Sequence, residues 1–251
     1  MAEEAGAATG PTVAEGIWYF SPTGTGRAVA EGLQKRFPNV VLHDLTTPAA
    51  RSAAPLPAEG DLCTLIVPVY ANGAPELVLD WLERVPAGTK RWVFIATYGS
   101  VNRGQALEEC ARAVRGKGTV VGAAALPGPH CYDCIPGIPK APPSWDWAAL
   151  EDFYRAVREK EEGIRLKAPG VHIPQRWMAW LCAPPPKEGE GCIHCGRCLA
   201  ACPTGGEGCI RCGACVRLCP TGGRKLAFRT PFPLWYIRRG MAEEKTGFFQ
   251  K

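Results

Sequence analysis

The chain of 251 residues has no long apolar segment. Its longest candidate, residues 177–183, is far shorter than the roughly 20 residues of a membrane-spanning helix, so we expect no membrane span. The first sixteen residues are rich in Ala, Gly and Glu and lack the basic start and apolar centre of a secretion signal. We therefore expect residues 1–16 to be a disordered tail and the protein to be cytoplasmic, with reduced cysteines.

Two nucleotide-binding fingerprints are also missing. The loop S-P-T-G-T-G at residues 21–26 has no lysine of the kind found in P-loops, which excludes a nucleoside triphosphate as the expected ligand. A dinucleotide fingerprint needs a third glycine, and Val29 stands in its place. A loop with hydroxyls and free N–H groups at a helix N-terminus can still hold an anion, and an ordinary turn between strand and helix is the alternative.

Cysteine, in contrast, is abundant, with 13 residues. Residues 192–202 read C-I-H-C-G-R-C-L-A-A-C, and residues 209–219 read C-I-R-C-G-A-C-V-R-L-C, each followed by Pro. Both are C-x₂-C-x₂-C-x₃-C-P, the bacterial pattern for a [4Fe–4S] cluster. The runs form an internal repeat of period 17, with ten of fifteen positions identical from 192–206 to 209–223. The eight thiolates predict two clusters and one-electron transfer.

Zinc and disulfides are the alternatives for these cysteines. Zinc sites usually pair two C-x₂-C units across a longer spacer, whereas here four cysteines crowd into each short run. A disulfide framework suits a secreted chain, and nothing in the sequence indicates secretion. Gly196 and Gly213 lie inside the runs, where a side chain would crowd the inorganic sulfides, and this favours a cluster.

The doubled run is similar to the two-cluster ferredoxins, in which the fourth cysteine of each run ligates the other cluster. This resemblance implies one cluster held by Cys192, Cys195, Cys198 and Cys219. It implies a second cluster held by Cys209, Cys212, Cys215 and Cys202. Only six residues separate Cys202 from Cys209, where ordinary two-cluster ferredoxins have a longer hairpin. The short spacer concerns which cysteines share a cluster. It does not change the expected number of two clusters.

The positive charge of the chain is confined to its C-terminal part. Residues 187–251 carry eleven Lys and Arg against five Asp and Glu, a formal +6, and residues 1–186 carry eighteen against nineteen, a formal −1. Each oxidised cluster with four thiolates adds about −2, which brings the C-terminal part to about +2. The basic residues thus partly compensate the clusters, and we expect no nucleic-acid binding.

Residues 17–163 alternate strand and helix signals, which predicts an α/β domain with a parallel sheet. The expected strands are residues 17–20, 40–43, 62–70, 92–98 and 119–126. The expected helices are residues 27–37, 76–85, 104–115 and 147–162. Between the second and third strands the chain is rich in Pro and Ala, so any helix there is short or absent. After this domain we expect a linker at 164–191, a cluster domain at 192–226 and a tail at 227–251.

The stretch W-Y-F-S-P-T-G-T-G-R, residues 18–27, resembles the phosphate loop of the flavodoxins. It is especially similar to a family that fuses a flavodoxin-like domain to a two-cluster ferredoxin. In that family the strand-three loop reads much like P-V-Y-A-N-G-A-P-E-L (68–77), and the strand-four loop like T-Y-G-S-V-N-R (97–103). The resemblance covers residues 17 to about 226. It implies a flavodoxin-like five-stranded parallel sheet that binds FMN at the carboxyl ends of its strands, followed by a small C-terminal two-cluster ferredoxin domain.

The resemblance also implies the FMN contacts. The phosphate would be held by Ser21, Thr23, Gly24 and Thr25. One side of the flavin ring would be lined by Tyr70, Asn72 and Gly73. The other side would be lined by Tyr98, Gly99, Asn102 and Arg103, with Tyr98 as the stacking ring. Gly26 stands where flavodoxins usually have Ser or Thr, so one phosphate hydroxyl is missing.

Two features fit more than one role. Cys131 and Cys134 form a C-x₂-C pair that could be a redox dithiol or a pair of ordinary loop cysteines, and the neighbouring His130 could contact the flavin or cap the loop. The tail at residues 234–241, L-W-Y-I-R-R-G-M, is aromatic and basic. It could dock on the α/β domain, on a partner protein or on a membrane surface.

Together these features predict an electron-transfer flavoprotein of an anaerobic setting, rather than a stand-alone enzyme. It would relay electrons between FMN and two [4Fe–4S] clusters, with redox proteins rather than NAD(P)H as donor and acceptor. One alternative is a flavin-dependent reductase of a small substrate, assisted by His130, Cys131 or Cys134. The other is a non-catalytic iron–sulfur sensor or binding module.

Overall fold

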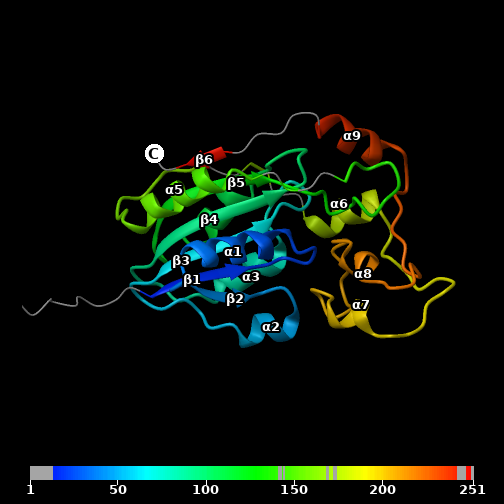
Figure 1. The fold of residues 1–251 in the computed structure, drawn as a ribbon, viewed down its shortest axis with the longest axis horizontal. Coiled ribbons are helices and arrows are strands. Elements are labelled where there is room, and N and C mark those ends of the chain that lie inside the picture. Colours follow the sequence, from blue (N-terminus) through cyan, green and yellow to red (C-terminus); the bar gives the residue numbers. More distant parts are fainter. Residues whose placement is uncertain are drawn as a thin grey trace, which may run out of the picture.

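The computed structural model describes residues 14–140, 143, 145–167, 170–171, 174–241 and 247–249. A sheet of six strands forms its centre (Figure 1). The strands are β1 (Glu15–Tyr19), β2 (Val41–Asp44), β3 (Leu62–Pro68), β4 (Arg91–Tyr98), β5 (Thr119–Pro127) and β6 (Gly247–Phe249). Most of the N-terminal tail expected at residues 1–16 lies outside the described residues, and β1 already begins at Glu15.

The strand order is β2-β1-β3-β4-β5-β6. Strands β1 to β5 are all parallel, and β6 pairs with β5 in the antiparallel direction. The α/β fold class with a parallel sheet in the order 2-1-3-4-5 is therefore confirmed. In such a sheet the order reverses between β1 and β3, and ligands bind beyond the carboxyl ends of the strands at that point.

Five helices connect the parallel strands and close the domain. They are α1 (Thr25–Arg36), α2 (Pro48–Ala53), α3 (Glu76–Glu83), α4 (Ala106–Ala113) and α5 (Trp147–Arg158). Helices α1 and α5 pack on one face of the sheet, with Leu33 and Phe153 in one core. Helices α3 and α4 pack on the other face, with Trp81 and Leu107 in the second core. The sheet is thus buried on both faces, which explains its nearly continuous apolar strands.

One buried hydrogen bond ties α5 to the sheet and gives a test of this packing. The hydroxyl oxygens of Thr64 in β3 and Tyr154 in α5 lie 3.1 Å apart, and both side chains are buried. We expect Tyr154→Phe to lower the free energy of unfolding by about 1–2 kcal/mol, because it strands the Thr64 hydroxyl without a partner. Denaturant unfolding of the double variant Thr64→Val/Tyr154→Phe should recover most of the loss; no recovery would contradict this account.

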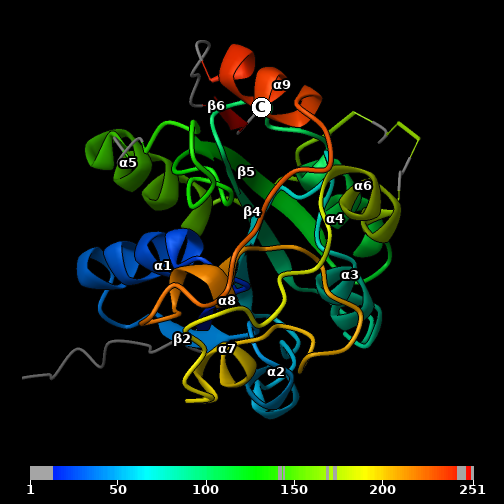
Figure 2. The ribbon, with the colours of Figure 1, turned by 90° about the vertical axis from the view of Figure 1, so that its right-hand side faces the viewer.

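The C-terminal part lies beyond the carboxyl ends of the strands. It contains α6 (Gln175–Cys182), α7 (Arg197–Ala200), α8 (Ala214–Arg217) and α9 (Phe232–Gly240). Figure 1 shows α7 and α8 next to the strand ends, and Figure 2, which views the molecule from that side, shows α8 directly in front of the sheet. Among the described residues no helix has the length and apolar character needed to cross a membrane.

The segment expected to be a linker is held against the α/β domain. The Gln175 side chain is buried, and its amide donates a hydrogen bond to the carbonyl of Ala74 at 2.9 Å. The Gln175 N–H donates to Glu76 Oε1 at 3.0 Å. Gln175 is polar and lies in a Pro-rich stretch, and such a sequence does not predict a buried side chain. The sequence therefore predicts a linker in place of α6.

The aromatic tail also docks on the α/β domain. Ile237 of α9 packs with Ile135, Ile138, Ala183 and Leu226 in a small third core. Beyond α9, β6 adds to the edge of β5, and the Phe248 ring lies 5.3 Å from the ring of Phe153. The sheet therefore has six strands instead of the five expected, and the tail covers an edge that would otherwise expose unpaired backbone groups.

Candidate cofactor sites

The two cysteine runs follow the same backbone path, as their repeat predicts. In each run the residue before the second cysteine has a positive φ, 51° at His194 and 55° at Arg211. The glycine after that cysteine is also left-handed, with φ of 72° at Gly196 and 78° at Gly213, and a short helix starts there. The two left-handed positions curl each run, so that its first three cysteines can face a common centre.

The last cysteine of each run has the same polar neighbour. Cys202 Sγ lies 3.4 Å from Thr204 Oγ1, and Cys219 Sγ lies 3.7 Å from Thr221 Oγ1. The hydrogen bond with Thr221, together with backbone N–H groups, lowers the pKa of the Cys219 thiol to about 7. At Cys219 these hydrogen bonds favour the thiolate, which is the form that binds iron.

Four cysteines from both runs line one pocket: Cys202, Cys209, Cys212 and Cys215. Burial raises the pKa of the Cys212 thiol to about 12, and the neighbouring cysteines Cys215, Cys209 and Cys202 add to the shift. Burial also raises the pKa of Cys215. Because these thiols lose their protons only where positive charge compensates the thiolates, the set suits a metal centre with four sulfur ligands.

Three of the other four cysteines of the runs, Cys192, Cys198 and Cys219, lie beside the segment that follows the second run. Arg224 connects two of them, since its guanidinium interacts with Cys198 and its backbone N–H donates to Cys219. Gly223 lies against the backbone of Cys192, where an added Cβ would come within 2.9 Å of the Cys192 nitrogen. Cys195 is the exposed member of this set.

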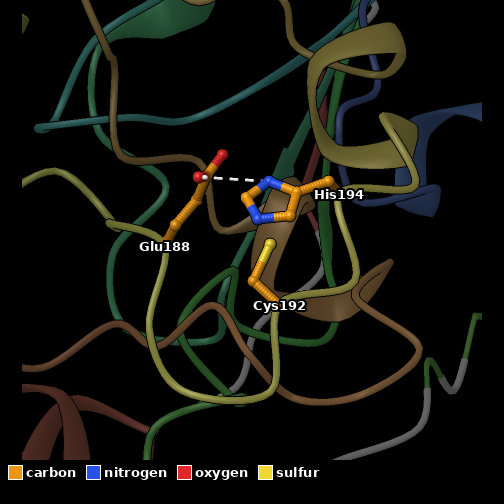
Figure 3. A group of neighbouring side chains, drawn as sticks. All are labelled: Glu188, Cys192 and His194. Atoms are coloured by element: carbon orange, nitrogen blue, oxygen red, sulfur yellow. Dashed lines mark ion pairs between the residues drawn. The ribbon is translucent and has the colours of Figure 1, made fainter.

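A further group that the sequence analysis missed adjoins Cys192. Figure 3 shows the Cys192 sulfur pointing toward the Glu188 carboxylate and the His194 ring, and ligand atoms of the three lie within 4.8 Å of one another. Glu188 precedes the repeat and is not part of any cysteine motif, so the sequence pattern did not identify it. It is paired with Arg224 at 3.0 Å. We therefore assign this group to the surroundings of the first cysteine run and not to a separate metal site.

The second run packs directly on the α/β domain. Cys212 and Ala214 belong to the same buried core as Tyr70 and Tyr98 at the ends of β3 and β4. Arg217 of α8 donates a hydrogen bond to the carbonyl of His130 at 2.9 Å. It also forms an ion pair of 2.6 Å with Asp133. The loop that follows β5 thus holds the second run in place.

Gly213 gives a test of this contact with a matched control. An added Cβ at Gly213 would lie 2.8 Å from the Cys131 carbonyl oxygen, whereas at Gly196, its counterpart in the repeat, nothing lies within 4 Å. Both positions are left-handed, so alanine should cost about 1 kcal/mol of stability at either one. We expect Gly213→Ala to cost roughly 2 kcal/mol more, because the crowded contact must shift. Anaerobic thermal unfolding measures both; equal losses would contradict the contact.

A second pocket lies at the carboxyl ends of β1, β3 and β4. Its empty space is about 420 Å³, a volume that includes the solvent at its open mouth. Seven of the twelve expected FMN residues line it: Ser21, Thr23, Thr25, Gly26, Tyr70, Tyr98 and Gly99. The pocket is also lined by Phe20, Pro22, Pro68, Val69, Thr97, Pro129, His130 and Cys131.

The loop at residues 21–26 is a tight turn that starts α1. The N–H of Gly24 donates to the Ser21 carbonyl at 3.1 Å, and Gly24 caps the helix with a φ of 88°. Ser21 Oγ accepts the N–H of Arg27 at 3.0 Å, which leaves its hydroxyl proton available to a ligand. Hydroxyls and the positive end of a twelve-residue helix therefore meet at this end of the pocket.

The other five expected FMN residues do not line the pocket. Gly24 is exposed at the turn. Asn72 and Asn102 join the strand-three and strand-four loops, with Asn102 Nδ2 donating to Asn72 Oδ1 at 3.2 Å. Arg103 pairs with Glu108 at 3.1 Å. Gly73 lies against Glu109, where a Cβ would come within 2.6 Å of Oε2. Among these residues, Asn72 and Asn102 connect two loops, and Gly73 and Arg103 lie against Glu109 and Glu108 of α4.

His130 and Tyr70 are polar residues that line the pocket. Burial, with a smaller effect of Arg217, lowers the pKa of His130 to about 4, so the ring is neutral near pH 7. Its Nδ1 accepts the N–H of Tyr132 at 3.1 Å, which places the proton on Nε2. The buried Tyr70 hydroxyl has no hydrogen-bond partner among the described residues. Such a group costs stability unless a ligand satisfies it.

The thiols of the C-x₂-C pair are poorly suited to redox chemistry. Burial raises the pKa of Cys131, and the thiolate of Cys212 raises it further. Burial also raises the pKa of Cys134. Because the thiolate is the reactive form, both side chains are weak nucleophiles near neutral pH. This geometry gives no support to a dithiol mechanism.

Comparison with known families finds a match in the cysteine-rich region. The family described as "4Fe-4S binding domain" matches the chain twice, over residues 189–205 and 206–222. No curated protein matches the chain. The two matches contain the two runs, so the chain carries a 4Fe–4S ferredoxin-type region after its parallel α/β domain. At this level its function is electron transfer through [4Fe–4S] clusters.

Proposed function

We propose that this protein relays single electrons between FMN, bound at the carboxyl ends of β1, β3 and β4, and two [4Fe–4S] clusters that serve a redox partner protein. The observation that carries the proposal is the contact between the two sites. Tyr70 and Cys131 line the pocket. Tyr70 shares a buried core with Cys212, and the Cys131 carbonyl lies against Gly213, the residue after Cys212. The second cysteine run is therefore next to the pocket wall.

The crossed ligand assignment is part of this proposal. Cys202 comes from the first run, yet it lines a pocket with three cysteines of the second. In return, Cys219 of the second run shares Arg224 with Cys198 of the first. Both observations support ligand sets that take three cysteines from one run and the fourth from the other. Although only six residues lie between Cys202 and Cys209, both cysteines line the same pocket.

FMN is proposed from the resemblance to flavodoxins together with the pocket itself. The α1 N-terminus with Ser21, Thr23 and Thr25 suits the phosphate. The unpartnered Tyr70 hydroxyl suits a polar edge of the ring. When bound, FMN exchanges one or two electrons and each cluster exchanges one, so the chain would couple the two kinds of redox partner.

The two cysteine sets differ in burial, and this difference indicates which set faces the pocket. Cys212 of the second set is buried, whereas Cys195 of the first set is exposed. We infer that the second set faces the flavin pocket and that the first set faces the partner protein. Exposed apolar side chains of the first run, Ile193 and Leu199, suit a contact with such a partner.

A stepwise reductive titration of anaerobically purified protein tests this function. We expect a flavin absorbance change and two cluster EPR signals. In the variant Cys212→Ala, which is expected to lose the cluster next to the pocket, reduced flavin should pass electrons to the partner-facing cluster more slowly in a rapid-mixing experiment. Equal rates with and without Cys212 would overturn the proposed order of flavin, second cysteine set and first cysteine set.

A further inference from the structure

Two helices turn an apolar stripe toward solvent. On α6 the stripe is Trp177, Trp180 and Leu181, and on α9 it is Phe232, Trp235 and Tyr236; these side chains are 48% to 64% exposed. Each set follows helical spacing of i, i+3 and i+4, the spacing with which a surface helix normally faces its core. A group of exposed aromatic residues on ordered helices marks an interaction surface.

The two stripes belong to one assembled part of the molecule. The N–H of Arg229, just before α9, donates to the Cys182 carbonyl at 2.9 Å, and its Nε donates to the Trp180 carbonyl at 2.7 Å. Ala183 and Ile237 share the third core below. We call the six side chains Trp177, Trp180, Leu181, Phe232, Trp235 and Tyr236 the aromatic surface.

The two segments that carry the aromatic surface have an excess of positive charge, although Glu188 and Glu190 directly follow the first of them. The segments 174–187 and 227–241 contain five Lys and Arg and no Asp or Glu. These five are Arg176, Lys187, Arg229, Arg238 and Arg239, and all are exposed. The guanidinium of Arg239 lies 5.6 Å from the ring centre of Trp235, and that of Arg229 lies 5.6 Å from the ring centre of Trp180. The acidic residue next to α6, Glu76, is hydrogen-bonded to the helix start.

We propose that the aromatic surface docks the protein on an anionic lipid bilayer. Tryptophan and tyrosine side chains suit the headgroup region, where an apolar ring and a polar N–H or O–H are both satisfied. The surrounding arginines match the negative charge of anionic lipids. A second copy of the chain would bring the same positive segments together, so self-association is disfavoured.

Docking of this kind is peripheral and leaves the first cysteine run accessible. Short helices with aromatic residues and arginines lie in the plane of the interface and do not cross it. Figure 2 shows α9 at the upper end of the molecule and α7 at the lower part of the same view. A bilayer on the aromatic surface thus remains compatible with a partner protein at α7. This inference does not depend on FMN.

Co-sedimentation of the full holoprotein with vesicles tests the inference. One set of vesicles contains phosphatidylcholine alone and the other an equimolar mixture with phosphatidylglycerol. We expect binding to the anionic vesicles only, with a blue shift of tryptophan fluorescence, and weaker binding at high salt. The charge reversal Arg238→Glu/Arg239→Glu should lower the partition coefficient at least roughly thirtyfold. Trp235→Ser should lower it and reduce the blue shift.

Two control variants separate docking from general changes of surface. Arg112→Glu/Arg115→Glu reverses two exposed arginines at the end of α4, and Val41→Ser removes an exposed apolar side chain from β2. Both should bind the anionic vesicles like the unaltered protein, with unchanged iron content in every variant. Four outcomes would each overturn the proposal. Two concern the unaltered protein: absence of binding, or equal binding to both vesicle types. The others are equal losses of binding in control and test variants, and binding of an acidic protein to this surface in place of vesicles.

Discussion

Cys202→Ala and Cys212→Ala should each remove about four of eight irons per chain, and the double variant should still retain about four. The two residues come from different runs, but they line the same pocket. Loss of either one breaks the same proposed ligand set, so their effects do not add. The double variant Cys202→Ala/Cys195→Ala should retain no iron, because it breaks both sets. Iron and acid-labile sulfide analysis after anaerobic purification measures each count.

The opposite pattern would establish an uncrossed assignment. In that case Cys202→Ala/Cys195→Ala would retain about four irons and Cys202→Ala/Cys212→Ala would retain none. Cys182→Ser is the matched control, since Cys182 is a half-buried free cysteine outside both runs. It should leave the iron content unchanged. The prediction depends on ligand identity and not on stability, because both double variants remove two thiols.

Thr25→Asp should abolish FMN binding while leaving the fold as stable as before. Thr25 is the first residue of α1 and lines the pocket. The first turn of α1 has no acidic residue, so a new carboxylate there is favourable to the helix by a few tenths of a kcal/mol or more. The same carboxylate repels the phosphate, and we expect a loss of at least about 3 kcal/mol, or hundredfold, in affinity.

Titration of FMN into flavin-free protein, followed by fluorescence, measures this effect. Thr119→Asp introduces the same charge at the exposed start of β5, at the opposite end of the sheet. It should bind FMN normally. Because the variant at Thr25 is expected to keep its thermal stability, a loss of flavin cannot be attributed to unfolding. Unchanged affinity in Thr25→Asp would place the phosphate elsewhere or exclude FMN.

The sheet could be predicted from the sequence because its pattern is strong. Strands such as Leu62–Pro68 and Arg91–Tyr98 are buried on both faces, which requires the nearly continuous apolar runs that the sequence contains. The repeat of the cysteine runs is matched in the structure by left-handed backbone at the equivalent positions Gly196 and Gly213. Local patterns of this kind need no knowledge of distant contacts.

The features that could not be predicted from the sequence depend on contacts between residues that are far apart in the chain. Strand β6 has three residues, and only its pairing with β5 makes it a strand. The burial of Gln175 depends on carbonyls of Tyr70 and Ala74, about a hundred positions earlier in the chain. The loop residues Asn72 and Asn102, for which the resemblance implies flavin contacts, also bond to each other across two loops, and the motifs did not indicate this pairing. A short motif identifies residue types and cannot show which neighbour satisfies them.

The contact between the pocket and the second cysteine run is the central element of this account. It could not be read from the sequence, since Tyr70, Cys131 and Cys212 lie in three separate segments. Their packing in one buried region brings the two sites close together, and this proximity is the basis for expecting electron transfer between them. Everything proposed about function depends on both sites being filled in one chain.

The most direct test is therefore the content of FMN, iron and acid-labile sulfide per chain in protein purified without oxygen. We predict about one FMN with about eight irons and eight sulfides. Zinc in place of iron, or about eight irons with no flavin even after FMN is added, would contradict the account. In the second case the α/β domain would be a scaffold for the ferredoxin region and not an electron carrier.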